Sequence, residues 1–302
     1  MSDAEIDVIR ALLAAQPRPT ELSERRRRLD ALGSHYPIPA DVSLNPVDAN
    51  GVAAEWTMTP AADPSRALLF LHGGGYVSGS IDSHRVMVAE AGRQAGARTL
   101  ALGYRLAPEH PFPAALDDAL AGYRFLLAQG FAPGRIAIGG DSAGGGLTIA
   151  TMVSLRDAGM ALPACGWCIS PWVDLAMTGE SMTTKAATDP LIQKDYLREL
   201  AAAYLDGADP ARPLASPLHA RLAGLPPLLI QVGSAETLLD DSVRLAGRAG
   251  AADVRVTLEV WPDMIHVWPL FHQQVAAGRR ALASAGAFMR AALDSTGSSP
   301  AA

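Results

Sequence analysis

Residues 136–146 read Ile-Ala-Ile-Gly-Gly-Asp-Ser-Ala-Gly-Gly-Gly. The apolar run Ile136–Ile138 predicts a buried strand, and the residues from Leu147 to Leu155 predict a helix. Between them, Gly140–Gly144 matches the pattern G-x-S-x-G, which places a nucleophilic serine on a turn between a strand and a helix. Glycines suit the positions beside Ser142, because a Cβ would clash in so sharp a turn. We interpret Ser142 as a nucleophile; the alternative is a glycine-rich turn whose serine only caps a helix.

The composition predicts one large α/β domain with an elaboration, because 49% of the 302 residues are hydrophobic. A net charge of −6 argues against nucleic acid as a partner, since nucleic acid usually binds a basic surface. We interpret the basic run Arg25–Arg28 as the solvated face of a helix. It is too short to predict binding to a membrane surface.

The start of the chain, Met-Ser-Asp-Ala-Glu-Ile, lacks the basic and apolar regions of a signal peptide. No stretch reaches transmembrane length without charges or prolines. We therefore expect a cytoplasmic protein that has no membrane partner.

Two cysteines, Cys165 and Cys168, form a C-x-x-C pair that could indicate redox chemistry or zinc. Residues 164–170 predict a buried strand, however, and side chains three apart on a strand point to opposite faces. A zinc site would also need a second ligand pair, which the sequence does not offer. We expect two buried structural thiols and no metal site.

Strands and helices are predicted to alternate on both sides of the serine motif. The expected strands are 67–71, 98–102, 135–138, 164–170, 227–232 and 255–260, and the expected helices are 85–95, 114–128, 146–156, 238–249 and 274–293. This rhythm, with continuously apolar strands, predicts a mostly parallel sheet with helices on both faces.

Other segments lie outside this rhythm. Helices are expected at 3–15 and 20–33, and a hairpin at 42–46 and 52–58, joined through Asn50-Gly51. The proline-rich stretch 175–221, with a helix at 194–204, is predicted to be an insertion. The expected division is therefore N-terminal helices (1–40), core (41–174), insertion (175–221), core (222–295) and a flexible tail (296–302), with fraying from Asp294.

A nucleophilic serine needs a histidine as base, and functional groups of such sheets gather on loops after the carboxyl ends of strands. Of seven histidines, His266 lies between the last predicted strand and the last helix. His72 also follows a strand, but the three glycines after it suggest a role other than that of the base. We therefore predict His266 as the base.

The acid that orients the base is expected after the preceding strand, where Glu236 lies. Asp240 and Asp241 come later, in the first turn of the next helix, where they favour the helix dipole. Asp263 is interpreted as a turn residue beside His266. The predicted order Ser142, Glu236, His266 is the serine–acid–histidine order of the α/β-hydrolase fold.

Glycines 73–75 follow His72 at the end of an upstream strand, where this fold needs backbone donors for an oxyanion. Without side chains, the amides of Gly74 and Gly75 can approach the substrate closely, and the N–H of Ala143 would complete the set. The alternative of a phosphate cradle is weak, because no phosphate-loop pattern occurs there.

At these motifs the sequence resembles the hormone-sensitive lipase family of α/β-hydrolase esterases, especially its bacterial members. The resemblance covers residues 68–270 and includes 72–76 (HGGGY), 104–114 (YRLAPEHPFPA), 140–145 (GDSAGG), 170–174 (SPWVD) and 261–266 (WPDMIH). It implies a helical cap built from the N-terminal helices and the insertion. It also implies hydrolysis of small carboxylic esters with short acyl chains, without metal or cofactor, and a homodimer formed through the last strand and helix.

One departure concerns the acid, because most relatives carry Asp-Pro-Leu where this chain has Glu236-Thr-Leu238; a subgroup is similar in using glutamate. Residues expected to contact the substrate are Tyr76 and, in the insertion, Leu191, Ile192, Tyr196, Leu197 and Tyr204. Plain packing of the cap on the core is the alternative for the insertion residues. Lactone or amide hydrolysis would use the same triad, and a non-catalytic ligand-binding protein on this fold is the alternative outside enzymes.

Overall fold

The computed structural model describes residues 4–16 and 18–295. Their strands form one sheet of eight in the order β1-β2-β4-β3-β5-β6-β7-β8. The strands are β1 (Ser43–Asp48), β2 (Ala53–Met58), β3 (Asp63–Leu71), β4 (Ala97–Leu102), β5 (Ile136–Asp141), β6 (Cys165–Ile169), β7 (Leu228–Gly233) and β8 (Val256–Trp261). From β4 to β8 neighbouring strands run parallel, whereas β1 and β2 are antiparallel additions at one edge. The predicted mostly parallel sheet and its N-terminal hairpin are confirmed.

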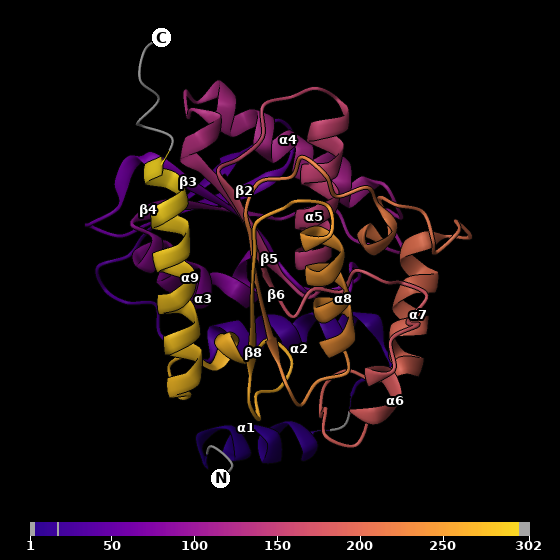
Figure 1. Ribbon diagram of the computed structural model, residues 1–302. Coiled ribbons are helices and arrows are strands. Elements are labelled where there is room, and N and C mark those ends of the chain that lie inside the picture. Colours follow the sequence, from indigo (N-terminus) through magenta and orange to yellow (C-terminus); the bar gives the residue numbers. More distant parts are fainter. Residues whose placement is uncertain (1–3, 17, 296–302) are drawn as a thin grey trace.

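Helices cover both faces of the sheet (Figure 1). Along β3, Leu68 and Phe70 point into one hydrophobic cluster, and Leu69 and Leu71 point into the other. The first cluster lies under α3 (Ile81–Ala95) and α9 (Ala276–Ser295); the second lies under α4 (Ala114–Ala128), α5 (Ala143–Asp157) and α8 (Leu239–Gly250). Every residue of β5, β6 and β7 is therefore buried, which explains the continuous apolar runs.

Two helices begin earlier than predicted. Helix α3 begins at Ile81 instead of residue 85, because the Ser80 side chain accepts a hydrogen bond from the Ser83 N–H and forms a capping box. Helix α5 begins directly after Ser142, and glycines 144–146 belong to its first turn. Glycine is a poor helix former, so the helical pattern alone placed the start of α5 too late.

The remaining helices lie outside the sheet, at its carboxyl edge (Figure 1). They are α1 (Ala4–Ala14), α2 (Leu22–Ser34), α6 (Ser181–Thr184) and α7 (Lys194–Leu205). Short 3-10 helices elsewhere in the described residues are Pro133–Arg135, directly before β5, Pro217–His219 and Trp268–Phe271. The four-residue helix α6 was not predicted. Helices α1 and α2 come from the N-terminus and α6 and α7 from the insertion, so two distant segments cover one edge of the sheet.

The prediction that Arg25–Arg28 is a solvated face is wrong for two of its side chains. Arg25 forms an ion pair with Glu199 of α7 at 2.6 Å, and Arg26 forms one with Glu109 at 2.7 Å. Arg26 also donates hydrogen bonds to the carbonyl oxygens of Val77 and Ala107. These contacts fasten α2 to the insertion and to the core, which a charge pattern alone does not reveal.

Helix α9 continues through Ser295, so the fraying expected from Asp294 does not begin there. The predicted flexible tail, residues 296–302, lies outside the described residues. Within the described ranges, no helix combines the length and apolar character needed to cross a bilayer. Cys165 and Cys168 are free and buried in opposite hydrophobic clusters, as expected. Burial raises the pKa of the Cys165 thiol to about 12, which leaves it unreactive at neutral pH.

Candidate active site

Ser142 stands on a strained turn between β5 and α5. Its φ of 53° and ψ of −120° lie in a region that L-residues rarely adopt. The turn is possible because glycines surround it: a Cβ on Gly144 would collide with the carbonyl oxygens of Leu71 and His72. The Ser142 N–H is bound to the Ile169 carbonyl at 2.8 Å, so the backbone holds the side chain at the end of the sheet.

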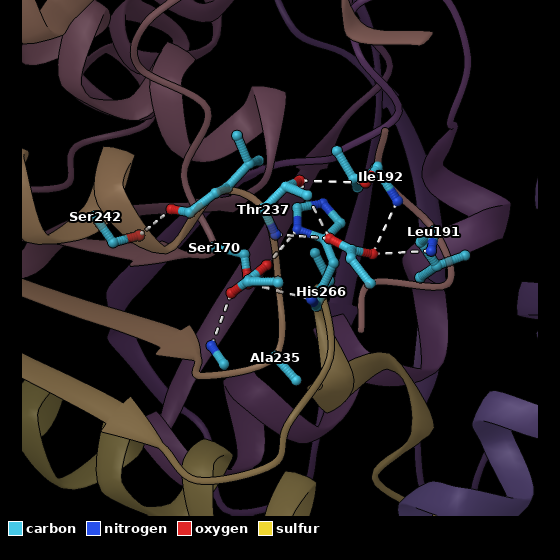
Figure 2. A network of polar contacts seen from close by, with 12 residues as sticks. Ser170, Leu191, Ile192, Ala235, Thr237, Ser242 and His266 are labelled. Carbon is cyan, nitrogen blue, oxygen red and sulfur yellow. Dashed lines mark hydrogen bonds and ion pairs between the residues drawn. The ribbon is translucent and has the colours of Figure 1, made fainter. Parts of the chain in front are cut away.

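His266 and Glu236 form a buried pair. Nδ1 of His266 lies 2.6 Å from Oε2 of Glu236, and the carboxylate is fully buried. The other oxygen, Oε1, accepts hydrogen bonds from the Gly233 N–H at 2.7 Å and from the Ser170 hydroxyl at 2.8 Å. His266 and Ser170, which both contact this carboxylate, lie close together in Figure 2. Both oxygens are thus satisfied, as a buried charge requires.

The pair sets the protonation behaviour of the site. Burial alone lowers the pKa of His266, but the hydrogen bond and negative charge of Glu236 raise it above its ordinary value. Burial raises the pKa of the Glu236 carboxyl, and the hydrogen bonds from His266 and Ser170 partly offset that rise. The carboxylate therefore stabilises an imidazolium, which is what a base needs after it has taken a proton.

The other acidic candidates serve the backbone. Asp240 accepts a hydrogen bond from the Ser181 N–H at 2.8 Å, and buried Asp241 accepts from the N–H groups of Val173 and Asp174. Asp263 has a φ of 62° and occupies the turn before His266, as expected. Of these four carboxylates, the one in contact with His266 is that of Glu236.

The glycine loop after β3 is held by the residue next to the nucleophile. The Gly73 N–H donates to Oδ1 of Asp141 at 2.9 Å, and His84 Nε2 lies 3.2 Å from the same carboxylate. Gly74 and Gly75 have φ values of 112° and 65°, which glycine adopts without strain. Asp141 thus connects this loop to the serine turn. This contact fits a supporting role for the residue that precedes the nucleophile in the motif.

His72 has a structural place in this loop. Its ring stacks on Tyr104 with centroids 4.2 Å apart, and the Tyr104 hydroxyl donates to the His72 carbonyl at 2.6 Å. Burial, together with nearby His84, lowers the pKa of His72 to about 4, so the ring is neutral. Both residues therefore hold the loop by local contacts, as expected for Tyr104.

A cavity of about 170 Å³ brings the predicted residues together. Ser142, His266, Gly74 and Gly75 line it, and so do four of the predicted insertion residues, Leu191, Ile192, Tyr196 and Leu197. The cavity wall also includes residues that sequence reasoning missed: Leu13, Arg18, Leu29, Leu32, Leu200, Leu270 and Phe271. Ala143 follows the nucleophile as the first residue of α5, so its N–H belongs to the unpaired donors of a helix start.

Tyr76 and Tyr204 are placed differently from the prediction. Their rings stack on each other with centroids 3.8 Å apart, both are buried, and neither lines the cavity. They pack the insertion against the glycine loop behind the cavity wall. The sequence could not distinguish this position from a lining one, because both need an aromatic side chain.

Ser170 is a further residue that sequence reasoning did not assign. Its hydroxyl donates to Glu236 and accepts a hydrogen bond from the Val267 N–H at 3.1 Å, so it joins the acid loop to the histidine loop. The available signal was its position directly after β6. Its side chain bridges the two loops that carry the histidine and its acid.

We expect Ser170→Ala to lower the free energy of unfolding by about 1–3 kcal/mol, because it leaves a buried carboxylate oxygen with one partner fewer. Hydrolytic activity should fall with it, since Glu236 is less firmly held. Urea denaturation and steady-state kinetics measure the two effects. Ser242→Ala is the control, because buried Ser242 makes only a 3.4 Å contact to a carbonyl of its own turn. Equal effects of the two substitutions would contradict the bridging role.

The described part of the chain contains no group of three or more His, Cys, Asp or Glu side chains arranged to hold a metal ion.

Comparison with known proteins places this site in a family. A sequence model of the α/β-hydrolase fold family matches residues 68–270. The chain is 48% identical to an acetyl-hydrolase of Streptomyces hygroscopicus over 298 residues, which cover 97% of this chain and 98% of that protein. It is 34% identical to an esterase of Acinetobacter venetianus over 261 residues, 86% of each protein.

A solved structure indicates the same family. The crystal structure of an esterase from the bacterial hormone-sensitive lipase family is 49% identical and superposes with a TM-score of 0.94, over 97% of this chain and 99% of that one. The similarity in sequence and the similarity in structure both extend over nearly the whole length of this chain. The chain belongs to the bacterial hormone-sensitive lipase family of esterases, on the α/β-hydrolase fold.

Proposed function

We propose that this protein is a serine carboxylesterase that hydrolyses short-chain carboxylic esters through an acyl-enzyme intermediate. The observation that supports this function most directly is the shared cavity, which Ser142, His266 and the glycine loop all line while Glu236 holds His266 from behind. The names of the relatives, an acetyl-hydrolase and esterases, support the same reaction class.

In the first half of the reaction, the Ser142 hydroxyl attacks the ester carbonyl carbon. Nε2 of neutral His266 takes the hydroxyl proton, and Glu236 stabilises the resulting imidazolium through the 2.6 Å contact at Nδ1. The carbonyl oxygen becomes an oxyanion, for which we propose the N–H groups of Gly74, Gly75 and Ala143 as donors. His266 then gives the proton to the leaving alkoxide, and the alcohol departs.

In the second half, water takes the place of the alcohol. His266 removes a proton from the water, which attacks the acyl carbon, and the same donors hold the second oxyanion. Collapse of this intermediate returns the proton to Ser142 and releases the carboxylic acid. Ser142 and His266 are thereby returned to their starting protonation states.

The size of the cavity supports short acyl groups. Its volume of about 170 Å³ is below the range of roughly 300–1,000 Å³ that is typical of sites for drug-sized ligands. The side chains of Leu191, Ile192, Tyr196 and Leu197 would contact the apolar part of the substrate. In this proposal α1, α2 and the insertion at 175–221 form a cap over the core.

Covalent labelling tests the proposal. A fluorophosphonate probe should modify one serine, and tandem mass spectrometry should locate it at Ser142, because only a serine activated by a base reacts readily. Prior incubation with p-nitrophenyl butyrate should slow the labelling by competition. A protein that binds the ester but gives neither labelling nor product would instead be the non-catalytic ligand-binding alternative. Parallel assays with lactones and amides would show whether either is preferred over esters.

The homodimer and the cytoplasmic location stay predictions. A homodimer formed through the last strand and helix is compatible with β8, which is an edge strand and carries a side chain, Val260, that is 44% exposed. Light scattering coupled to size-exclusion chromatography would measure the oligomeric state. A cytoplasmic location is likewise a prediction.

A further inference from the structure

A second, larger cavity lies next to the catalytic one. It has a volume of about 440 Å³ and is lined by the N-terminal helices, the segment between them and the insertion. Both cavities are lined by the same six residues, Leu13, Arg18, Leu29, Leu32, Leu191 and Tyr196. These six side chains therefore lie where the two cavities adjoin, and together they are called the wall below.

Arg18 is the charged member of this wall and is held across it. Its guanidinium carbon lies 3.6 Å from the centroid of the Tyr196 ring, and its Nη2 donates to the carbonyl oxygen of Leu191. Among the described residues, no carboxylate lies within ion-pair distance of Arg18. The guanidinium is thus used to stack on the ring and to bind the backbone, which fixes its long side chain in the wall.

The opposite side of the wall is fixed to the catalytic machinery. Oδ1 of buried Asp189 accepts hydrogen bonds from the N–H groups of Leu191 and Ile192 at 2.8 and 2.9 Å. Its Oδ2 accepts from the N–H of Thr237 at 2.8 Å, one residue after Glu236. Leu191, Ile192 and Thr237, whose N–H groups all donate to this carboxylate, lie close together in Figure 2. The carbonyl that Arg18 binds is therefore held in place relative to the acid loop.

We propose that Arg18, stacked on Tyr196, is a specificity-determining residue that closes the catalytic cavity and limits the length of the acyl chain. This inference rests on the proposed esterase function. If the wall were opened, the chain could continue from the cavity of about 170 Å³ into that of about 440 Å³. The joined space would fall within the roughly 300–1,000 Å³ typical of larger ligands.

The test compares Arg18→Ala with the unmodified protein on p-nitrophenyl esters from acetate to decanoate. We expect the ratio of kcat/KM for octanoate to that for butyrate to rise at least about tenfold, since each newly buried methylene corresponds to roughly a fourfold gain. Activity on acetate should change little in comparison, because its acyl group does not reach the wall. Tyr196→Ala removes the other half of the stack and should shift the ratio in the same direction.

Two controls separate the wall from other effects. Arg18→Met keeps an unbranched side chain in the wall and should retain most of the original ratio. Arg198→Ala removes an arginine from the exposed side of α7, where Arg198 pairs with Asp195, and should leave the ratio unchanged. An octanoate-to-butyrate ratio that stays the same in both Arg18→Ala and Tyr196→Ala would overturn the inference. Because the unmodified protein must hydrolyse acetate in a Ser142-dependent way, failure of the proposed function would be seen separately.

Discussion

Replacing Ser142 with alanine should lower kcat for p-nitrophenyl butyrate by about a million-fold, which is the scale of loss when a nucleophile is removed from such a triad. The reason is that His266 can then only activate water, and no acyl-enzyme forms. The residual rate would come from the oxyanion donors and from substrate binding. Stopped-assay kinetics with large amounts of enzyme would measure it.

The fold should survive this change, because alanine is smaller than serine and fits the same place without a new contact. Ser142→Gly is a useful partner variant: glycine adopts a φ of 53° without strain, so this variant should be equally inactive and at least as stable in thermal unfolding. Substantial activity in the alanine variant, with the same fluorophosphonate labelling pattern, would show that another serine carries out the reaction.

Replacing Glu236 with glutamine should lower kcat/KM by about four orders of magnitude, as expected when the negative charge behind a catalytic histidine is removed. The change also has a signature in pH dependence. His266 acts as a base only when neutral, so activity must rise with pH through its pKa. Glu236 raises that pKa above the ordinary 6.5, so loss of the charge should move the rise in activity to lower pH.

The matched control for this variant is Asp240→Asn. Asp240 carries the same charge four residues later, but its carboxylate accepts a hydrogen bond from the Ser181 backbone instead of His266. We expect a change of only a few-fold and no movement of the pH profile. A larger loss in Asp240→Asn than in Glu236→Gln would identify Asp240 as the acid. Rates measured from pH 5 to 9 with a short-chain ester would distinguish these outcomes.

The sequence could place Ser142, Glu236 and His266 because a motif marks the serine and because the acid and the histidine each follow a predicted strand. In a parallel sheet the carboxyl ends of all strands lie at one edge, so residues just after β5, β7 and β8 must meet there. The glycine loop after β3 joins them for the same reason. Its glycines were visible in the sequence because close backbone approach tolerates no other residue.

The walls of the cavity could not be predicted in this way. Leu13, Arg18, Leu29 and Leu32 reach it because α1 and α2 lie over the sheet edge, and their placement depends on contacts such as that of Arg25 with Glu199. Such long-range contacts leave no local sequence pattern. The sequence around a charged residue is the same whether its side chain is solvated or forms an ion pair. The same limit explains why Tyr76 and Tyr204 were expected in the cavity although they stack behind it.

The sequence by itself thus determined the sheet, its two covered faces, the family and the residues that meet at the strand ends. Each of these depends on local periodicity or on a motif whose backbone geometry admits few residue types. Only the tertiary structure decided that Ser170 bridges the acid and histidine loops and that Arg18 lines two neighbouring cavities. Those roles depend on the directions of single side chains from segments far apart in the chain, and packing alone sets these directions.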